Sequence, residues 1–580
     1  MLRELVEYAR RDTGDIPLGY RQFREPIRWF LEVDAEGKGK IVEGDSNPPR
    51  PYLHRTSAVS PLLLVDEASY VLGKEDRGGS KRAKEKEKEK FSAFWSLMEE
   101  AYTKTRKSDL AQILAVRDHW PPDGLDRVDP NDVVGVRVRG GTVPLADSDV
   151  QAFWFAHTTG EAMSTIEGQC AVCGRRKPLL RKLPFGIKGF DQDVKIMSFN
   201  LEAFQSYGKE QGLNAPTCME CGSLAASALS HLLRNNSPNK VSLQRGEGLG
   251  RLTAVFWCRM RMAEAAEIGE FDVLEALRAP IGGPDVGTGH LSQDLRKVSS
   301  LLRLPWKPKE SALLAESDMF HMLVLSNNDT RLVVRVWIQG SLEETKQRLA
   351  KFLMCSFMIG PNGETPYPPS ISTILNALES GNPNVARALL EGAYSGRALP
   401  ESLTRLAVTR LRNPKLWSKS QEAWKTQALL SLVRIQRNSD PTIMSSSSPT
   451  ERLDPHRANP AYLCGRLLAV LERAQGIASS WSVGATVVDR AYGAAATSPK
   501  ISFPPLLKIA IKAHLPSAGK ATRNTMDEVM ASLDDAGGFP VTLDLSQQAD
   551  FALGFYHQRA AFRESSKSKE VAQEAPKEEI

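Results

Sequence analysis

Four cysteines in two closely spaced pairs are the residues of this sequence best suited to chemistry. Cys170 and Cys173 form one Cys-x-x-Cys pair, and Cys218 and Cys221 form another. Two residues between the cysteines let both sulfurs of a turn face one ion, and two such turns complete the closed tetrahedral shell of a structural zinc site. We therefore predict structural zinc here. Unmetallated thiols and redox or iron–sulfur use are the alternatives.

The stretch between the two pairs is longer than in a usual zinc ribbon. We therefore expect it to fold as an insertion, within a zinc-knuckle region at 165–225. The other cysteines, Cys258, Cys355 and Cys464, are isolated among apolar neighbours and fit core positions. An odd total of seven cysteines argues for reduced thiols and against a disulfide framework.

Basic residues beside the first cysteine pair are candidates for phosphate contacts. Arg175, Arg176 and Lys177 follow that pair after one glycine. They either offset the negative charge of a thiolate site or bind a nucleic-acid backbone. We favour the second interpretation.

A second basic segment lies at 77–90, where lysine and glutamate alternate after a short Gly-Gly-Ser run. Such a sequence buries nothing, so we predict a mobile basic loop over 74–90. Lys81, Arg82 and Lys84 would close on phosphates. The alternative is that the loop is only solvated.

Compact catalytic motifs fail on inspection. The segment 517–520 resembles the end of a phosphate-binding loop, but His514 replaces its first glycine and Ala521 replaces the hydroxyl residue that should hold magnesium. A glycine-rich segment at 246–251 lacks the third glycine of a dinucleotide fingerprint, and the nine histidines form no HExxH motif. We therefore expect a protein that is not an enzyme.

The composition is that of a globular protein of several domains. The chain has 580 residues, 41% hydrophobic and 25% charged, with a net charge of +6 and a pI near 8.8. This balance is only mildly basic, so any nucleic-acid binding must use local patches. No apolar run is long enough to span a bilayer, and the charged start does not fit a signal peptide, so we expect a cytoplasmic protein without membrane contact.

Hydrophobic patterns predict an α+β fold: a mixed α/β N-terminal region with antiparallel sheets and the zinc-knuckle insertion, followed by a C-terminal helical bundle. Residue types typical of strands indicate one at 27–33, and alternating apolar residues indicate strands at 134–139 and 332–338. Arg137 and Arg335 would lie on the solvent-facing side of such sheets, as a basic surface or as solvated side chains only. Apolar stripes with helical spacing occur at 463–474, 503–511 and 551–559. The predicted parts are 1–365, a helical connecting region 366–443, a bundle 444–565, and a disordered tail 566–580.

Six blocks in order along the chain carry a resemblance to a known family. They are SPLLLVDEASYVLG (60–73), SFN with SYG and NAP (198–216), RLVVRVW (331–337), AYLCGRL (461–467), DRAYG (489–493) and FALGFYHQR (551–559). Together they resemble the large subunit of type I-C CRISPR surveillance complexes (Cascade). Each block alone is weak, but the six in this order span nearly the whole chain.

The resemblance implies a non-catalytic subunit of a guide-RNA complex, with CRISPR backbone and guide-end-binding subunits as partners. Such a subunit inspects a short duplex motif beside the target, helps to open the duplex, holds the displaced strand and docks a helicase–nuclease. This is the logic of RNA-guided recognition, in which protein reads the short motif and pairing reads the rest. A stand-alone zinc-containing nuclease and a pure scaffold subunit are the alternatives.

The same resemblance suggests a surface that reads bases. We expect it to combine Arg55 with Asn200, Ser206, Gln211 and Asn214, because amides and hydroxyls pair with base edges. The alternative for the two asparagines is that they cap helices or turns.

Two departures from the family pattern stand in the first block and after it. Glu67 occupies a position where the family leads us to expect asparagine, which makes a base-reading role there doubtful, and the Lys/Glu tract enlarges the following loop. In this family a small helical subunit can also be made from an internal start. Met444 precedes the serine-rich linker 445–450 and would begin such a product.

Overall fold

The structure is a computed structural model. It describes residues 1–12, 17, 19–21, 23, 26–44, 46–53, 59–75, 81–159, 163–183, 186–187, 190, 194–199, 201–235, 237–243, 252–258, 277–282, 319–328, 331–380, 382–418, 422–439 and 448–574. The chain divides into two compact units, which we describe separately. Unit 1 comprises Met1–Ser237 with Asn327–Val333, and unit 2 comprises Pro238–Ser326 with Val334–Ile580.

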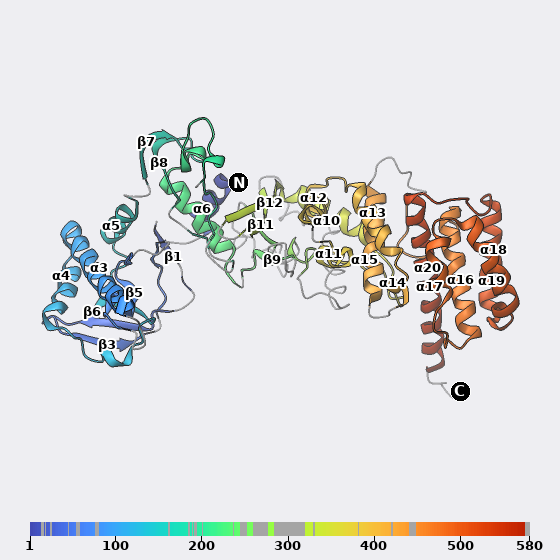
Figure 1. Cartoon of the computed structure of the whole chain (residues 1–580), viewed down its shortest axis with the longest axis horizontal. Coiled ribbons are helices and arrows are strands. Elements are labelled where there is room, and N and C mark those ends of the chain that lie inside the picture. The colour runs from blue at the N-terminus through green and yellow to red at the C-terminus, as the bar shows by residue number, and fades with distance from the viewer. Residues whose placement is uncertain are drawn as a thin grey trace, which may run out of the picture. The chain divides into compact units, whose positions relative to one another are not determined.

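A four-stranded sheet forms the centre of the first part of unit 1 (Figure 1). Its order is β3 (Gly39–Glu43), β2 (Trp29–Val33), β6 (Val133–Val138) and β5 (Val65–Glu67). Strand β2 runs antiparallel to β3 and parallel to β6, and β5 is antiparallel to β6. The strands predicted at 27–33 and 134–139 are confirmed. The short strands β1 (Tyr20–Arg21) and β4 (Arg50–Pro51) pair with one another elsewhere in unit 1.

Helices pack around this sheet and share its core. They are α2 (Ala68–Val71), α3 (Lys81–Thr105), α4 (Ser108–Leu114) and α5 (Ser148–Thr159), with the 3-10 turns η1 (Ala115–His119) and η2 (Leu125–Arg127). Phe94, Trp95 and Met98 of α3 are fully buried in the same core as Phe30 and Val136 of the strands. The sheet therefore buries one layer of side chains beneath α3.

The predicted mobile loop at 74–90 is wrong for its second half, because α3 begins at Lys81. Lysine, glutamate and alanine are strong helix formers even where they bury nothing. The apolar residues from Phe91 onward then anchor the same helix to the core. The C-terminal part of α3 is held by its packing against the core, and the helix continues from it towards the N-terminus through the Lys/Glu stretch.

The two arginines expected on solvent-facing sides of the sheets both make contacts within the chain. Arg137 forms an ion pair with Glu32 at 2.7 Å and lies over the ring of Phe30 at 4.2 Å from its centroid. Arg335 donates to the hydroxyl of Ser326 at 2.8 Å. Arg137 is therefore engaged within the fold, whereas Arg335, in the strand of the second sheet, stays exposed.

The cysteine-bearing part of unit 1 is small. It comprises the hairpin β7 (Met163–Gln169) and β8 (Arg176–Leu180), the 3-10 turns η3 (Glu202–Phe204) and η4 (Gln211–Asn214), and helix α6 (Met219–Leu232). Helix α1 (Leu2–Asp12) packs on α6, with the hydroxyl of Tyr8 at 2.9 Å from Nδ1 of His231. The N-terminal helix therefore supports the element that carries the second cysteine pair.

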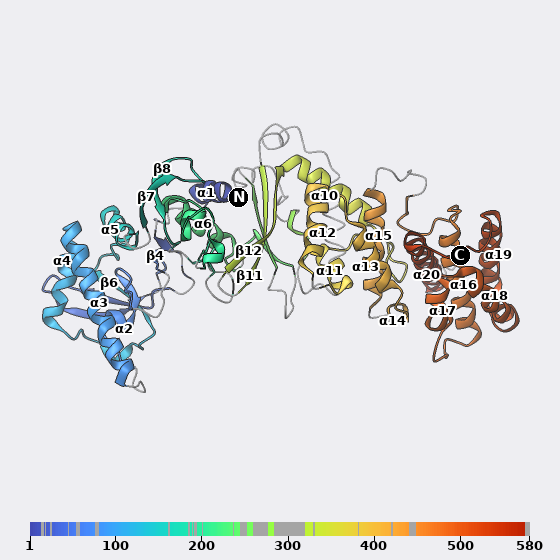
Figure 2. The same cartoon turned by 45° about the horizontal axis from the view of Figure 1, so that its top comes forward.

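Unit 2 begins with a second four-stranded sheet and continues as helices (Figure 2). The sheet order is β12 (Arg331–Ser341), β11 (Met319–Asn328), β10 (Thr253–Cys258) and β9 (Lys240–Ser242), and this confirms the strand predicted at 332–338. The following helices are α10 (Leu342–Ser356), α11 (Ile371–Leu378), α12 (Pro383–Ser395), α13 (Glu401–Leu411), α14 (Lys415–Ser418) and α15 (Ala423–Ser439). Helical structure in unit 2 thus begins at Leu342, before the predicted connecting region 366–443.

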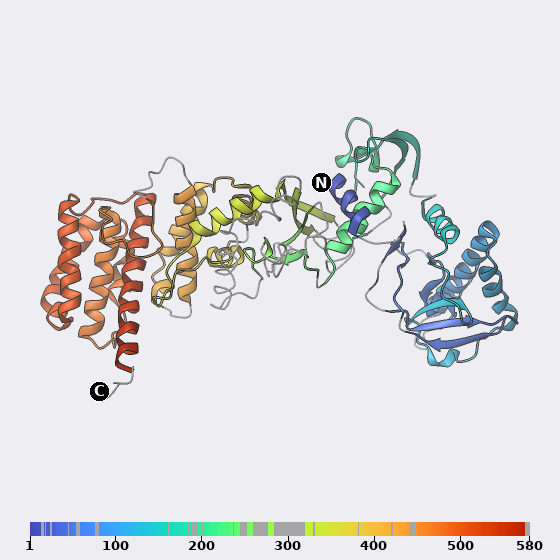
Figure 3. The same ribbon diagram turned by 180° about the vertical axis from the view of Figure 1, so that it is seen from behind.

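The C-terminal part of unit 2 is a helical bundle (Figure 3). It contains α16 (Pro460–Ala478), α17 (Val487–Ala495), α18 (Pro499–Ile509), the π-helical turn η9 (Ala510–His514), the 3-10 turn η10 (Leu515–Ser517), α19 (Gly519–Asp535) and α20 (Leu545–Glu574). Helices α16 and α20 form its centre and meet along most of their lengths. The predicted α+β class with a helical C-terminal region is confirmed.

Three details of this region correct or limit the predictions. The apolar stripe 503–511 breaks at its end, because the π-helical turn rotates the register and leaves Ile511 58% exposed. The prediction of a disordered tail is wrong for 566–574, because these residues continue helix α20. A helix that is already formed and packed can add polar residues at its end at little cost. Met444 and the first serines of the linker lie outside the described residues.

Candidate metal centre and nucleic-acid interface

The four predicted cysteines come together in space. Cys170 and Cys173 lie in the turn between β7 and β8, and Cys218 and Cys221 lie at the start of α6. Their four sulfur atoms are all within 4.8 Å of one another, and the Sγ atoms of Cys173 and Cys218 are 3.9 Å apart. Four thiolates bound to one zinc at about 2.3 Å would be separated by roughly 3.8 Å. The donor set and its spacing are therefore compatible with a single tetrahedral ion.

Backbone hydrogen bonds hold the two cysteine turns against one another. The N–H of Cys170 donates to the carbonyl of Arg175 at 3.0 Å, and the N–H of Ala171 donates to the carbonyl of Pro216 at 2.8 Å. Gly174 closes the first turn with φ of +71°, which glycine adopts without steric cost. The site is thus preformed by two turns that are far apart in sequence.

The electrostatics of the sulfurs differ within the cluster. Burial acts to raise the pKa of Cys170, but backbone N–H groups from both cysteine turns outweigh it and lower that pKa to about 7. One of these is the N–H of Cys218, which donates to Sγ of Cys170 at 3.3 Å. Burial raises the pKa of Cys218 and Cys221. Four thiols so close together cannot all ionise without a cation, which again fits a metal.

Of the three basic residues beside the first turn, only the arginines are open to a ligand. Lys177 pairs with Glu220 at 2.7 Å, and this hydrogen bond raises the lysine pKa. Glu220 also binds Arg10 of α1 at 2.8 Å, so the carboxylate ties α1, β8 and α6 together. Arg175 and Arg176 are exposed and form no ion pair among the described residues.

The predicted base-reading amides gather in one loop, where they serve its structure. Oδ1 of Asn214 accepts from the N–H of Ser206 at 2.9 Å. Its Nδ2 donates to the carbonyls of Lys209 and Gln211 at 2.7 and 2.9 Å. The side chain of Gln211 accepts from Arg181 at 3.1 Å. Asn214 therefore has no donor left for a base in this conformation, and the turn-stabilising alternative describes its geometry.

The loop that Asn214 braces exposes a residue that the sequence analysis missed. Tyr207 is 98% exposed at the tip of a turn that pairs Ser206 with Lys209. Tyr207 and Gly208 both have positive φ, at +55° and +68°. A bulky side chain in the left-handed region costs about 1–2 kcal/mol, and no burial compensates here. In the sequence, the Tyr-Gly pair between two polar residues could have predicted this turn.

The other predicted nucleic-acid contacts are Arg55, Asn200 and the basic residues at the start of α3. Arg55 and Asn200 lie outside the described residues. Lys81, Arg82 and Lys84 form the first turn of α3, and their side chains are outside the described set. Within the part that the structure describes, the cysteine cluster is the one group of three or more metal-ligating side chains close enough to share an ion.

Comparison with known proteins identifies the family. The chain matches the family described as CRISPR-associated protein (Cas_Csd1) over residues 4–563. The chain belongs to this family. Since the match covers nearly the whole chain, both units and the cysteine cluster lie inside the Cas_Csd1 region, which is consistent with a subunit of a Cascade-type complex. A search of curated proteins found no match. None of the described helices of this Cas_Csd1 protein is both long and apolar enough to cross a membrane.

Proposed function

We propose that this chain is the large, non-catalytic subunit of a type I-C guide-RNA surveillance complex. In that role it reads the short motif beside the target in duplex DNA, promotes strand opening, holds the displaced strand and recruits a helicase–nuclease. The observation that carries the proposal is the match to the Cas_Csd1 family over residues 4–563. The division of labour follows the physics of RNA-guided recognition, in which base pairing reads most of the sequence.

The surroundings of the cysteine cluster support DNA contact by unit 1. Two turns bring four thiols together and leave Arg175 and Arg176 exposed beside them, without a carboxylate partner in the described part of the chain. Guanidinium groups of this kind bind phosphate oxygens through paired hydrogen bonds. In the proposed role, structural zinc at the four cysteines fixes the backbone that presents these arginines, and it has no open position for catalysis.

The turn at Tyr207 supplies a second contact surface on unit 1. An aromatic ring that is exposed and held in an unfavourable backbone conformation has stacking area available for a base or sugar. Asn214 then acts through the turn as a positioning residue. This revises the expected reading surface, because the ring and the free arginines replace the asparagine amide as the groups that reach DNA.

The proposal includes a second product of the gene. A start at Met444 would release the helices α16–α20 as a small subunit, and in the full chain these helices share one core with the preceding part of unit 2. Mass spectrometry of complex purified from its own operon should detect a chain from Met444 to Ile580. Recovery of full-length chain alone would refute this part of the proposal.

The experiment that tests the main proposal compares guide-loaded complexes assembled with and without this chain. Targets are duplexes that are identical except in the motif beside the paired region. We expect motif-dependent binding only when the chain is present. Binding that ignores both the chain and the motif would favour the scaffold alternative, and cleavage by the isolated chain with divalent metal would favour the nuclease alternative.

A variant series assigns the phosphate contacts. Replacement of both Arg175 and Arg176 by alanine should weaken duplex binding uniformly across flanking motifs. It should also reduce the slope of log K against log salt by about 2, since each phosphate contact contributes about 0.9. Lys351 and Arg405, two exposed cations of unit 2 replaced by alanine together, serve as the matched control. An equal effect in both variants would show that only net charge matters.

A further inference from the structure

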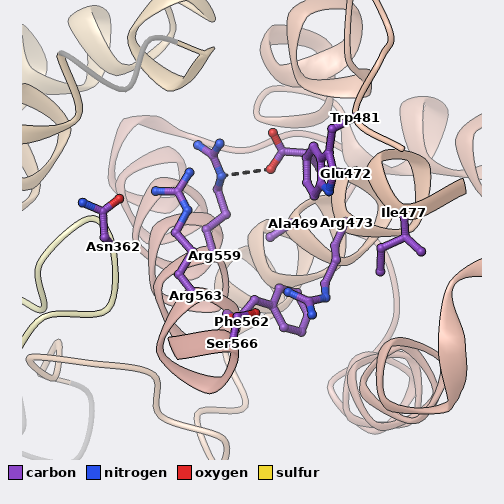
Figure 4. A pocket seen from close by; sticks show the side chains of 10 residues that line it. All are labelled: Asn362, Ala469, Glu472, Arg473, Ile477, Trp481, Arg559, Phe562, Arg563 and Ser566. Atoms are coloured by element: carbon purple, nitrogen blue, oxygen red, sulfur yellow. Dashed lines mark hydrogen bonds and ion pairs between the residues drawn. The ribbon is translucent and has the colours of Figure 1, made fainter. Parts of the chain in front are cut away.

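A pocket in the C-terminal bundle of unit 2 has features that the proposed function does not use. It lies between α16, α20 and the loop at Asn362, and it encloses about 510 Å³ (Figure 4). Ligand-binding pockets typically measure about 300–1,000 Å³. Three arginines, Arg473, Arg559 and Arg563, line it together with aromatic side chains.

The charges in this pocket do not balance. Nε of Arg559 pairs with the buried carboxylate of Glu472 at 2.9 Å, and this is the ion pair drawn in Figure 4. Arg563 donates to the backbone carbonyl of Pro361 at 2.6 Å, and Arg473 lies over the ring of Phe562 at 4.5 Å from its centroid. The carboxylates of Glu472 and Glu364 lie close enough to Arg563 to favour its charged form, whereas within the described part of the chain Arg473 has no carboxylate partner. The residues that line the pocket therefore carry three guanidinium groups and one carboxylate.

This excess charge is costly in an apolar setting. Burial lowers the pKa of both Arg473 and Arg563, although a guanidinium stays protonated near neutral pH. Arg473 is half-buried without a carboxylate beside it among the described residues, so it loses hydration and gains no ion pair in return. An anionic ligand would supply that missing partner, in the paired geometry that guanidinium and phosphate favour.

Trp481 stands at the mouth of the same pocket in an unusual conformation. Its side chain is 61% exposed, and both Ser480 and Trp481 have positive φ, at +50° and +58°. The N–H of Trp481 donates to the carbonyl of Gly476 at 2.8 Å, and the ring lies so close over Gly476 that a Cβ there would come within 2.5 Å of it. A strained backbone thus fixes the position of a ring that is not used to fill the core.

We propose that this pocket binds one nucleotide of a single DNA strand. Its phosphate lies against Arg473 and Arg563, and its base stacks on the exposed face of Trp481. Single-strand binding sites combine a cationic groove with aromatic platforms, and this pocket offers both groups at one place. An acidic peptide would satisfy the arginines but would leave the positioned indole ring without a role. The inference rests on the proposed function, because a single strand becomes available only when the duplex is opened.

Binding and crosslinking by the full-length chain test this site. The probe is an oligothymidylate of roughly 20 nucleotides that carries 5-iodouracil, since sites for single strands take several to many nucleotides. We expect photocrosslinks at Trp481. Trp481→Ala should weaken binding about 5- to 150-fold, the range for loss of one stacked base. Arg473→Gln should weaken binding and reduce the slope of log K against log salt by about 0.7, the value for one phosphate contact on a single strand. Trp481→Phe should retain most of the affinity, because phenylalanine keeps an aromatic face.

Controls separate the pocket from general charge and from folding. Arg523→Ala removes an exposed arginine from α19 of the same bundle and should leave binding unchanged. If Trp481→Ala unfolds the bundle, Arg473→Gln and the crosslink position still decide the matter. Crosslinks that map elsewhere, wild-type affinity in Arg473→Gln, or equal competition by polyglutamate would each overturn the inference.

The outcomes also distinguish this inference from the proposed function. Flank-dependent duplex binding by the assembled complex, with no effect of the pocket variants on single-strand binding, would reject the pocket and keep the function. Weakened single-strand binding in the pocket variants, without any flank dependence in the complex, would keep the pocket and reject the function.

Discussion

The contact between α16 and α20 allows a sharp test of the C-terminal architecture. Gly465 of α16 and Gly554 of α20 face the partner helix with no side chain between the backbones. A Cβ on Gly465 would fall far closer than 3.0 Å to the carbonyl oxygen of Phe551, and one on Gly554 would do the same to the carbonyl of Tyr462. Both glycines belong to sequence blocks that carry the family resemblance, and the structure gives them a packing role.

The perturbation is Gly465→Ala, and its sign is opposite to that of an ordinary helix position. Alanine in a helix is normally more favourable than glycine by about 1 kcal/mol. Here the added methyl group forces the helices apart by roughly 1 Å, which forfeits a quarter to a half of each contact across the seam. Overpacking of this kind costs about 1–3 kcal/mol. Because the contact between the two helices is long, we take the upper cost of about 3 kcal/mol. The helix preference of alanine offsets about 1 kcal/mol of it, so we expect a net destabilisation of about 2 kcal/mol.

The assay is thermal unfolding of the full chain, with hydrogen exchange to localise the change. A loss of about 2 kcal/mol should lower the Tm of a region of 150–250 residues by about 4–8 °C. Amides of α16 and α20 should lose protection first. The matched control is Gly493→Ala in α17, where a Cβ meets nothing within 4 Å, and it should stabilise the protein slightly. Equal stability of the two variants would refute the close helix crossing.

The remaining predictions concern buried and metal-ligating groups. Cys170→Ser should reduce bound zinc from about one ion per chain to near zero and destabilise unit 1, as measured by elemental mass spectrometry and melting; wild-type metal content would contradict the site. Asp550→Ala should cost about 3–5 kcal/mol, because it leaves Arg437 and Arg457 buried without their shared carboxylate, whereas exposed Asp535→Ala should cost almost nothing. Burial lowers the pKa of His557 to about 3, so the unfolded chain binds a proton that the folded chain does not; stability should be complete above about pH 6.5 and fall towards pH 3, by on the order of 4–5 kcal/mol. His557→Gln should remove about one proton from that pH dependence, and an unchanged slope would contradict the buried neutral imidazole.

Local patterns predicted the parts of this protein that depend on short-range chemistry. Aromatic and β-branched residues predicted β2, and alternation of apolar residues predicted β6 and β12, because a strand that buries one face must alternate. The cysteine pairs predicted their own cluster, because two residues between cysteines already set the turn geometry. Apolar residues with helical spacing predicted α16 and α20, because a helix that packs on one side must repeat its apolar residues every three to four positions.

Features that depend on tertiary context were missed or misread. The Lys/Glu tract resembles a loop until Phe94 and Trp95 anchor it as α3. Asn214 was predicted to contact bases because it lies in a polar loop, but in the structure its amide forms hydrogen bonds that stabilise the turn. The pocket at Arg473 brings together residues from two helices distant in sequence, and no spacing rule indicates that.

Flanking-motif selection tests the central claim most directly. A duplex library with a randomised flank beside a constant target is bound by guide-loaded complex, and the bound fraction is sequenced. We predict strong enrichment of one short motif with the wild-type chain, and loss of most of that enrichment with Tyr207→Ala, whose exposed ring should not affect folding. A flat distribution with the wild-type chain would contradict the claim that this Cas_Csd1 protein reads the flank.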